Sequence, residues 1–355
     1  MQDLPTYKLS NSLILSLAAI VITLAGVKYA EDIISPFLIA LFITAISGPA
    51  MLWLTRHKVP PGLAVLIIVL TIVILGFFFS SILSTSLHNF SQNIPHYQER
   101  LQMITGSLAS TLNKVGIHLQ LEELTRMFNL GKVMSFVGST FNQVLGALTN
   151  IFLILMMVIF LLLELSGFRY KLTAISKNPG QTMARLRNVS GTISRYFKIK
   201  TLTSILTALP IILVLQLMDI DFPLLWGMVA FLLNFVPNIG SIIAAIPVVL
   251  LALIQFGFVA AGEVAILYLV MNNVVGNFIE PRLMGRSLGL STLVVFLSLV
   301  FWGWLLGPVG MFLSVPLTMT LKIVMDNHED TRWISIMLSN EGEPSGTADF
   351  IKKGS

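Results

Sequence analysis

The chain has 355 residues, of which 55% are hydrophobic and only 11% charged, and its mean hydropathy is +0.86. A soluble domain carries about 25% charged residues, so this composition excludes the soluble classes and predicts an all-α polytopic membrane protein. The net charge of +5 is better explained by basic loops at a membrane than by nucleic-acid binding, and the absence of cysteine excludes disulfides and thiol chemistry.

The N-terminal region, residues 1–85, predicts three membrane-spanning helices, because a span needs about 20 apolar residues. The third starts after a proline pair and runs to about residue 83, and the first is a retained helix rather than a cleaved signal peptide. Residues 86–145 carry many charges with apolar positions at helical spacing, which indicates an amphipathic helical insert outside the bilayer. A fourth span is expected at 146–164.

The next segment, residues 165–200, contains eight lysines and arginines and no acidic residue. Short basic loops stay in the cytoplasm, so both termini, including the tail 327–355, are expected to be cytoplasmic. The segment also has an apolar stripe formed by Leu186, Val189, Ile193 and Phe197. Such a helix could lie in the membrane interface beside anionic lipids or pack on neighbouring helices, and the pattern favours neither.

Residues 201–326 contain two apolar segments that are interrupted in the same way. The segment 222–256 is interrupted by Pro237, Asn238 and Gly240, and the segment 290–324 by Gly307, Pro308 and Gly310. Paired interruptions of this kind are a sequence sign of a transport site, because broken backbone at membrane depth must be buried or line a cavity. We predict two re-entrant or broken-helix hairpins of opposite orientation, as in an inverted repeat, among about seven to eight transmembrane helices.

Uncharged polar side chains in this half are candidates for contacting a solute. Asn234 and Asn238 are spaced i, i+4 at the first break, and Asn273, Asn277 and Glu280 fall at spacing i, i+4, i+7 on a predicted helix. Asparagine amides both donate and accept hydrogen bonds, which suits a neutral, hydroxyl-rich solute. Hydrogen bonding between helices is an equal alternative.

Acidic residues near the membrane have two interpretations. Glu280 is either a proton carrier or half of a structural ion pair with Arg282 or Arg286, and the second is preferred. Glu263, at the outer end of a predicted span, is a second and more interfacial candidate for proton or cation coupling. No phosphate-binding loop, nucleophile elbow or zinc-protease motif occurs, so we expect no enzyme activity, cofactor or metal site.

Essentially the whole chain resembles a known family, and the specific motifs lie in its C-terminal half. The stretches "NFVPNIGSIIAAIP", "VGNFIEPRLMGRS" and "GPVGMFLSVP" are similar to those of the autoinducer-2 exporter (AI-2E) family of bacterial membrane proteins. The motif positions are Pro237, Asn238, Gly240, Glu280, Pro281, Arg282, Gly285, Gly307, Pro308, Gly310 and Pro316.

The resemblance implies export of the small polar quorum-sensing signal autoinducer-2 across the bacterial inner membrane. It also implies a homo-oligomer, with a pentamer as the expected form. Some family members are described as sodium/proton antiporters, which is the main alternative function. A non-transporting membrane scaffold that binds partners through residues 86–145 or the basic segment is a third hypothesis.

Overall fold

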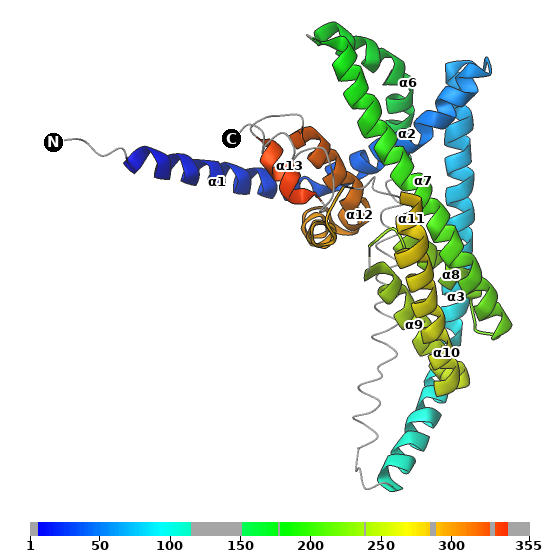
Figure 1. Ribbon diagram of the computed structural model, residues 1–355. Coiled ribbons are helices and arrows are strands. Elements are labelled where there is room, and N and C mark those ends of the chain that lie inside the picture. Colours follow the sequence, from blue (N-terminus) through cyan, green and yellow to red (C-terminus); the bar gives the residue numbers. More distant parts are fainter. Residues whose placement is uncertain are drawn as a thin grey trace.

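The computed structural model describes residues 6–114, 151–176, 178–237, 239–284, 289–326 and 331–339. Within these ranges all regular secondary structure is helical (Figure 1). Six helices among the described residues are long and apolar enough to cross a membrane, and further apolar helices are shorter. The all-helical, multi-pass membrane class predicted from composition is therefore confirmed.

The N-terminal part consists of α1 (Thr6–Tyr29), α2 (Glu31–Arg56), α3 (Pro61–Lys114) and α6 (Ile151–Ile175). Helix α1 extends away from the rest of the molecule (Figure 1). Helices α2, α3 and α6 share a buried apolar cluster. Helix α3 does not end at residue 83 but continues to Lys114, with a total length of 54 residues, so the insert predicted from residue 86 begins within a helix. The remainder of that insert, from residue 115 on, lies outside the described residues.

The basic segment and the fifth span form one helix, α7 (Pro179–Leu217), which begins with a proline at its first position. At 1.5 Å per residue its 39 residues extend about 58 Å, well beyond the roughly 30 Å of a hydrocarbon core. Ile193 and Phe197 of the apolar stripe are buried in a cluster with residues of α2 and of the C-terminal helices. Their burial favours a helix packed on its neighbours over one lying in the interface.

The first interrupted segment forms two helices, α8 (Pro223–Leu233) and α9 (Ile239–Phe256). The two ends of this segment are hydrogen-bonded to each other. The backbone N–H of Asp221 donates to the Gln255 side chain at 3.2 Å, and the Gln255 amide donates back to the Asp221 carboxylate. The segment therefore returns to the end from which it started and is a helical hairpin.

Two side chains from the C-terminal part of α3 form hydrogen bonds with the open end of this hairpin. The Tyr97 hydroxyl donates to the Asp221 carboxylate at 2.6 Å, and Arg100 donates to the Gln255 carbonyl at 2.5 Å. Burial, and then the hydrogen bond to Asp221, raise the pKa of the Tyr97 hydroxyl, so it keeps its proton and remains a donor. This contact gives part of the predicted insert a structural role that the sequence did not indicate.

Beyond Gly257 the chain forms one continuous rod made of α10 (Phe258–Met271), the π-helix η1 (Asn272–Ile279) and α11 (Glu280–Met284). The N–H of Glu280 donates to the carbonyl of Val275, five residues earlier, which is the π-helical pattern. Such wide turns inside α-helices occur frequently at functional sites.

The second interrupted segment, α12 (Thr292–Asp326), is also a hairpin. Its backbone leaves the helical conformation at Leu306 and Gly307. The Trp302 indole donates to the Thr318 hydroxyl at 2.9 Å, and Thr318 donates to Ser298 at 2.9 Å. Residues 20 apart would lie about 30 Å apart in a straight helix, so the two halves of α12 fold onto each other. A short helix, α13 (Arg332–Leu338), follows.

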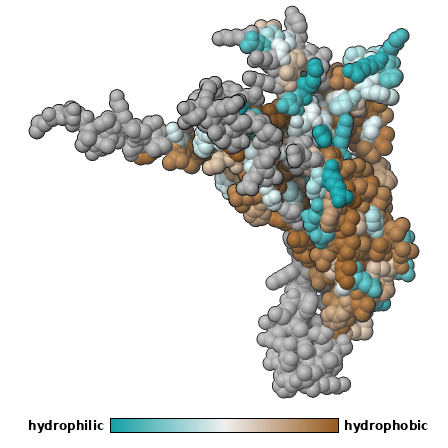
Figure 2. Space-filling view, viewed as in Figure 1, coloured by the Kyte–Doolittle hydropathy of each residue, from teal (hydrophilic) through white to brown (hydrophobic). Residues whose placement is uncertain are grey.

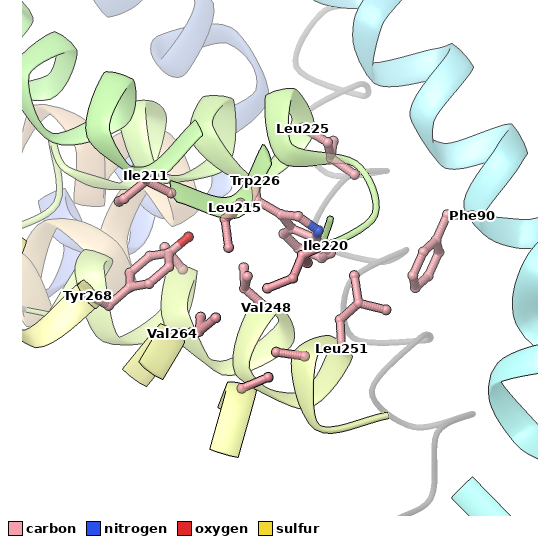
Figure 3. Close-up of a cluster of buried hydrophobic side chains, with 14 of the residues drawn as sticks. Phe90, Ile211, Leu215, Ile220, Leu225, Trp226, Val248, Leu251, Val264 and Tyr268 are labelled. Atoms are coloured by element: carbon pink, nitrogen blue, oxygen red, sulfur yellow. The ribbon is translucent and has the colours of Figure 1, made fainter. Parts of the chain in front are cut away.

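The largest buried cluster joins α3, α7 and the first hairpin to α10. Trp226, Ile211 and Val264 are among its fully buried members (Figure 3). On the outside, apolar side chains cover the surface over α9 and α10 (Figure 2). A buried core beneath an apolar surface is what a protein surrounded by lipid requires.

Candidate transport site

The tips of the two hairpins meet through an aromatic contact. The ring of Phe235, at the first break, stacks on Phe312, five residues after Gly307, with centroids 4.7 Å apart. Phe197 of α7 lies against both, at 6.3 Å and 6.4 Å. The two interruptions predicted from sequence are thus brought together around one face of α7.

A glycine lets each hairpin turn tightly. A Cβ on Gly240 would lie 1.8 Å from the Leu233 carbonyl oxygen, and one on Gly310 would lie 1.9 Å from the Trp302 carbonyl oxygen. No side chain fits at such distances, so at both breaks the returning helix presses its glycine against the end of the outgoing one. The corresponding use of Gly240 and Gly310 supports the view that the two breaks are equivalent structures.

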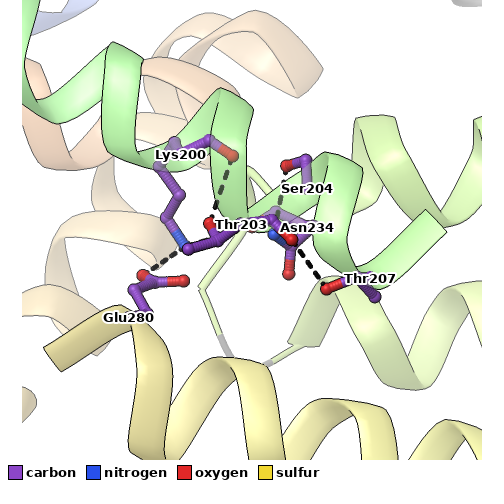
Figure 4. A network of polar contacts seen from close by, with 6 residues as sticks. All are labelled: Lys200, Thr203, Ser204, Thr207, Asn234 and Glu280. Carbon is purple, nitrogen blue, oxygen red and sulfur yellow. Dashed lines mark hydrogen bonds and ion pairs between the residues drawn. The ribbon is translucent and has the colours of Figure 1, made fainter. Parts of the chain in front are cut away.

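Beside the first break lies a buried ion pair. The Lys200 ammonium of α7 is 2.6 Å from the Glu280 carboxylate of α11, and the two side chains are only 5% and 16% exposed (Figure 4). Lys200 also donates to the Asn234 carbonyl at 3.1 Å. The ammonium therefore connects the C-terminal end of α8 to the residue that follows the π-helix.

Hydroxyl side chains continue this polar region along α7. The Asn234 amide donates to Ser204 at 3.0 Å. Thr203 donates to the Lys200 carbonyl at 3.1 Å, and Thr207 donates to the Thr203 carbonyl at 2.9 Å (Figure 4). All three hydroxyl residues are buried.

Lys200 belongs to this candidate site but was missed by the sequence prediction, because it ends the basic segment and resembles its other members. One signal could have identified it. Thr203, Ser204 and Thr207 follow Lys200 at i+3, i+4 and i+7, which is a polar stripe on a helix expected to span the membrane. A polar stripe inside an apolar span must face protein or water rather than lipid.

The site offers both kinds of hydrogen-bonding partner in a small volume. Lys200 supplies ammonium donors, Glu280 supplies carboxylate acceptors, and Asn234 supplies an amide. A neutral solute bearing several hydroxyl groups can accept from the first and donate to the second. Charged side chains at membrane depth are costly and mark ion or substrate pathways.

The predicted asparagines do not all converge on this place. Asn234 contributes directly, but Asn273 and Asn277 are exposed and hydrogen-bonded to each other, at 3.0 Å, and Asn273 also donates to the Leu269 carbonyl at 2.8 Å. A π-helix is wound more widely than an α-helix, so Glu280 turns towards α7 while the two asparagines face outward. The partner of Glu280 is Lys200 rather than the neighbouring Arg282, which is exposed.

The remaining predicted residues are dispersed around the two breaks. Pro237 is partly buried at the first turn, Pro316 is buried within α12, and Pro308, Pro281 and Glu263 are exposed. Asn238, Gly285 and Arg286 lie outside the described residues.

The second break also adjoins an ion pair. Gly307 has a φ of +60°, and a Cβ there would lie 2.6 Å from a carboxylate oxygen of Glu31 at the start of α2. Glu31 pairs with Lys28 at 2.5 Å. This pair is more exposed than Lys200–Glu280, with side chains 41% and 28% exposed.

The long apolar helices define the chain as a multi-pass membrane protein. Residues 17–330 match the AI-2E family transporters, and the chain belongs to this family.

Its relatives cover nearly the whole chain. The AI-2 transport protein TqsA of Escherichia coli K12 is 39% identical over 328 residues, which are 92% of this chain and 95% of TqsA. A candidate transport protein of Haemophilus influenzae Rd is 39% identical over 333 residues, covering 92% of this chain and 96% of the relative. The candidate transport protein YhhT of Escherichia coli K12 is 37% identical over 331 residues, covering 93% and 95%. The family resemblance drawn from the C-terminal motifs is confirmed.

Proposed function

We propose that this protein is a secondary transporter that exports autoinducer-2 from the cytoplasm across the bacterial inner membrane. The observation that carries the proposal is the buried contact of Lys200 with Glu280 and the Asn234 carbonyl, at the tip of a broken hairpin. This contact offers donors and acceptors to a small hydroxylated solute. The relative TqsA, named as an AI-2 transport protein, supports the choice of solute.

The proposed pathway runs between hairpins of opposite orientation. In the predicted topology the fifth span ends on the outside, where the first hairpin begins. The rod of α10, η1 and α11 returns to the cytoplasm, where the second hairpin begins. The first hairpin would then enter from outside and the second from the cytoplasm, as inverted repeats in transporters do.

The stacked rings of Phe235 and Phe312 form the closed barrier of this pathway in our proposal. They lie where the two tips meet, and Phe197 packs on both. Alternating access would separate the two rings by moving one hairpin against α7. The protein would act as a homo-oligomer, with a pentamer as the form that the family implies, and lipid would cover its remaining apolar surface.

Measurement of autoinducer-2 inside and outside cells tests this function. Cells expressing the wild type should hold less signal inside and more outside than cells lacking the protein. Asn234→Leu, which removes the amide beside Lys200, should abolish that difference at equal protein level. The exposed Asn277→Leu is the matched control and should retain most export. Equal distribution of the signal with and without the wild-type protein would reject the export function.

A second candidate function, cation/proton antiport, is favoured by one observation. Glu280 is a largely buried acid whose ion pair with Lys200 could be exchanged for a proton or a cation. Everted vesicles with a pH-sensitive dye should then show sodium-dependent proton movement that Glu280→Gln removes. Absence of sodium-dependent proton movement in wild-type vesicles would reject the antiport function and would mean that any solute export is not coupled to sodium/proton exchange.

A further inference from the structure

A pocket separate from the transport site lies along the first half of α7. Its volume is about 250 Å³. Its lining comes mostly from α7 and includes polar residues of that helix and two methionines from α11 and α12: Arg187, Asn188, Thr192, Arg195, Met284 and Met319. None of Lys200, Asn234 and Glu280 lines it, so the proposed transport mechanism leaves this pocket without a role.

Among the described residues, no acidic side chain pairs with the positive charge of this pocket. Neither Arg187 nor Arg195 makes an ion pair or a side-chain hydrogen bond with any residue in the described part of the chain. The whole segment 165–200 contains no acidic residue that could neutralise them. The side chains of Asn188 and Thr192, between the two arginines, are likewise not engaged with other described residues.

The spacing of these groups suits one anionic group. Arg187 and Arg195 are eight residues apart, about 12 Å along the helix axis, so their long side chains can converge on the space between them. Guanidinium groups bind phosphate oxygens in a bidentate manner, and an amide and a hydroxyl between them can bond further oxygens. The pocket is too small for a drug-sized ligand but sufficient for a headgroup.

The expected depth of the pocket favours a lipid as the source of the anionic group. If Leu217 marks one boundary of a hydrocarbon core of about 30 Å, the other boundary falls about 20 residues earlier, near Lys198. The residues from Arg187 to Arg195 then lie just beyond it, in the headgroup layer. Met284 and Met319 provide an apolar wall that a soluble phosphate would not need but the first methylenes of acyl chains would contact.

We propose that this pocket binds the headgroup of an anionic phospholipid, with its phosphodiester held by Arg187 and Arg195. The lipid would bridge three helices. These are α7, which carries Lys200, α11, which begins with Glu280, and α12, which forms the second hairpin. It would thereby hold the elements of the transport site together, whatever solute the protein carries.

Lipid titration of the purified full chain in detergent, followed by native mass spectrometry, tests the proposal. Phosphatidylglycerol should bind at one site more tightly than phosphatidylcholine. The double change Arg187→Gln/Arg195→Gln should weaken the phosphatidylglycerol affinity about 30-fold, since each cation near a membrane surface contributes about 1 kcal/mol, or about fivefold. The matched control Lys198→Gln/Arg56→Gln removes the same charge from exposed positions on the same predicted side and should change the affinity less than about threefold.

Two further arms keep the result decisive. Arg187→Lys/Arg195→Lys keeps the charge but loses bidentate geometry, so it should give an intermediate affinity, and thermal unfolding should show that all variants are folded. Equal binding of the two lipids, or unchanged binding by the double glutamine variant, would overturn the proposal. Arginine-dependent binding of inorganic phosphate as tight as that of phosphatidylglycerol would assign the pocket to a soluble anion and would overturn it too.

Discussion

At the scale of single residues, the Lys200–Glu280 pair has a structural role and, in our proposal, a role in transport. Its side chains come from α7 and α11, and the ammonium also holds the Asn234 carbonyl. Removing one member of a buried pair leaves the other charge uncompensated, whereas replacing both with apolar residues is often neutral for stability. Stability and transport can therefore be separated experimentally.

Lys200→Met and Glu280→Met should each destabilise the protein by about 3–5 kcal/mol, because each leaves one buried charge unpaired. The double variant Lys200→Met/Glu280→Met should recover most of the lost stability but remain inactive in export. Thermal unfolding in detergent and the export assay measure the two effects, with the exposed Lys198→Met as control. A double variant that exports like the wild type would show that the pair is only a structural lock.

At the scale of elements, the two hairpins depend on glycine at equivalent points. Gly240 and Gly310 each lie against a carbonyl of the preceding helix, so that even one methyl group would meet backbone that cannot move aside. This close packing, rather than flexibility, explains why a glycine follows each proline at the breaks.

Gly240→Ala and Gly310→Ala should therefore each destabilise the protein by about 1–3 kcal/mol or more through overpacking. Gly262→Ala in α10 is the matched control, since nothing lies within 4 Å of the position that its methyl group would take, and alanine favours helix by up to about 1 kcal/mol. Unfolding temperatures in detergent should fall for the first two and stay level or rise for the control. Equal effects at all three positions would argue against the tight turns.

The folding of α12 onto itself can be tested with introduced cysteines, because the chain has none of its own. The side chains of Ser298 and Thr318 are hydrogen-bonded at 2.9 Å, so Ser298→Cys/Thr318→Cys should form a disulfide on mild oxidation. Peptide mass spectrometry would detect it.

The control pair Val189→Cys/Leu209→Cys has the same separation within the continuous helix α7 and should stay reduced. A straight α12 would leave both pairs reduced, which would contradict the hairpin.

At the scale of the whole molecule, what could be predicted from sequence follows from how local each signal is. The breaks at Pro237 and Gly307 were predictable because proline and glycine act on the backbone where they stand. The pairing of Glu280 with Lys200, 80 residues earlier, was not, because it depends on which helices pack together. The outward orientation of the Asn273 side chain depends on a π-helix that no residue pattern predicted.

The same distinction applies to the larger elements. The positions of the spans could be predicted from the lengths of the apolar stretches. The C-terminal end of α3 and the N-terminal start of α7 could not, because both helices extend beyond the apolar stretch into charged sequence. Tyr97 and Arg100 explain why α3 continues so far. Their contacts with the first hairpin stabilise a stretch whose sequence resembles a separate insert.

The central claim is that the polar contact beside the first hairpin carries autoinducer-2 outward, and uptake of the signal into everted membrane vesicles tests it most directly. In these vesicles the cytoplasmic face is outside, so export appears as uptake. The wild type should accumulate autoinducer-2 faster than vesicles without the protein, and Lys200→Met/Glu280→Met should not exceed that background despite being folded. Uptake by the double variant at the wild-type rate, or no uptake by the wild type, would contradict the account.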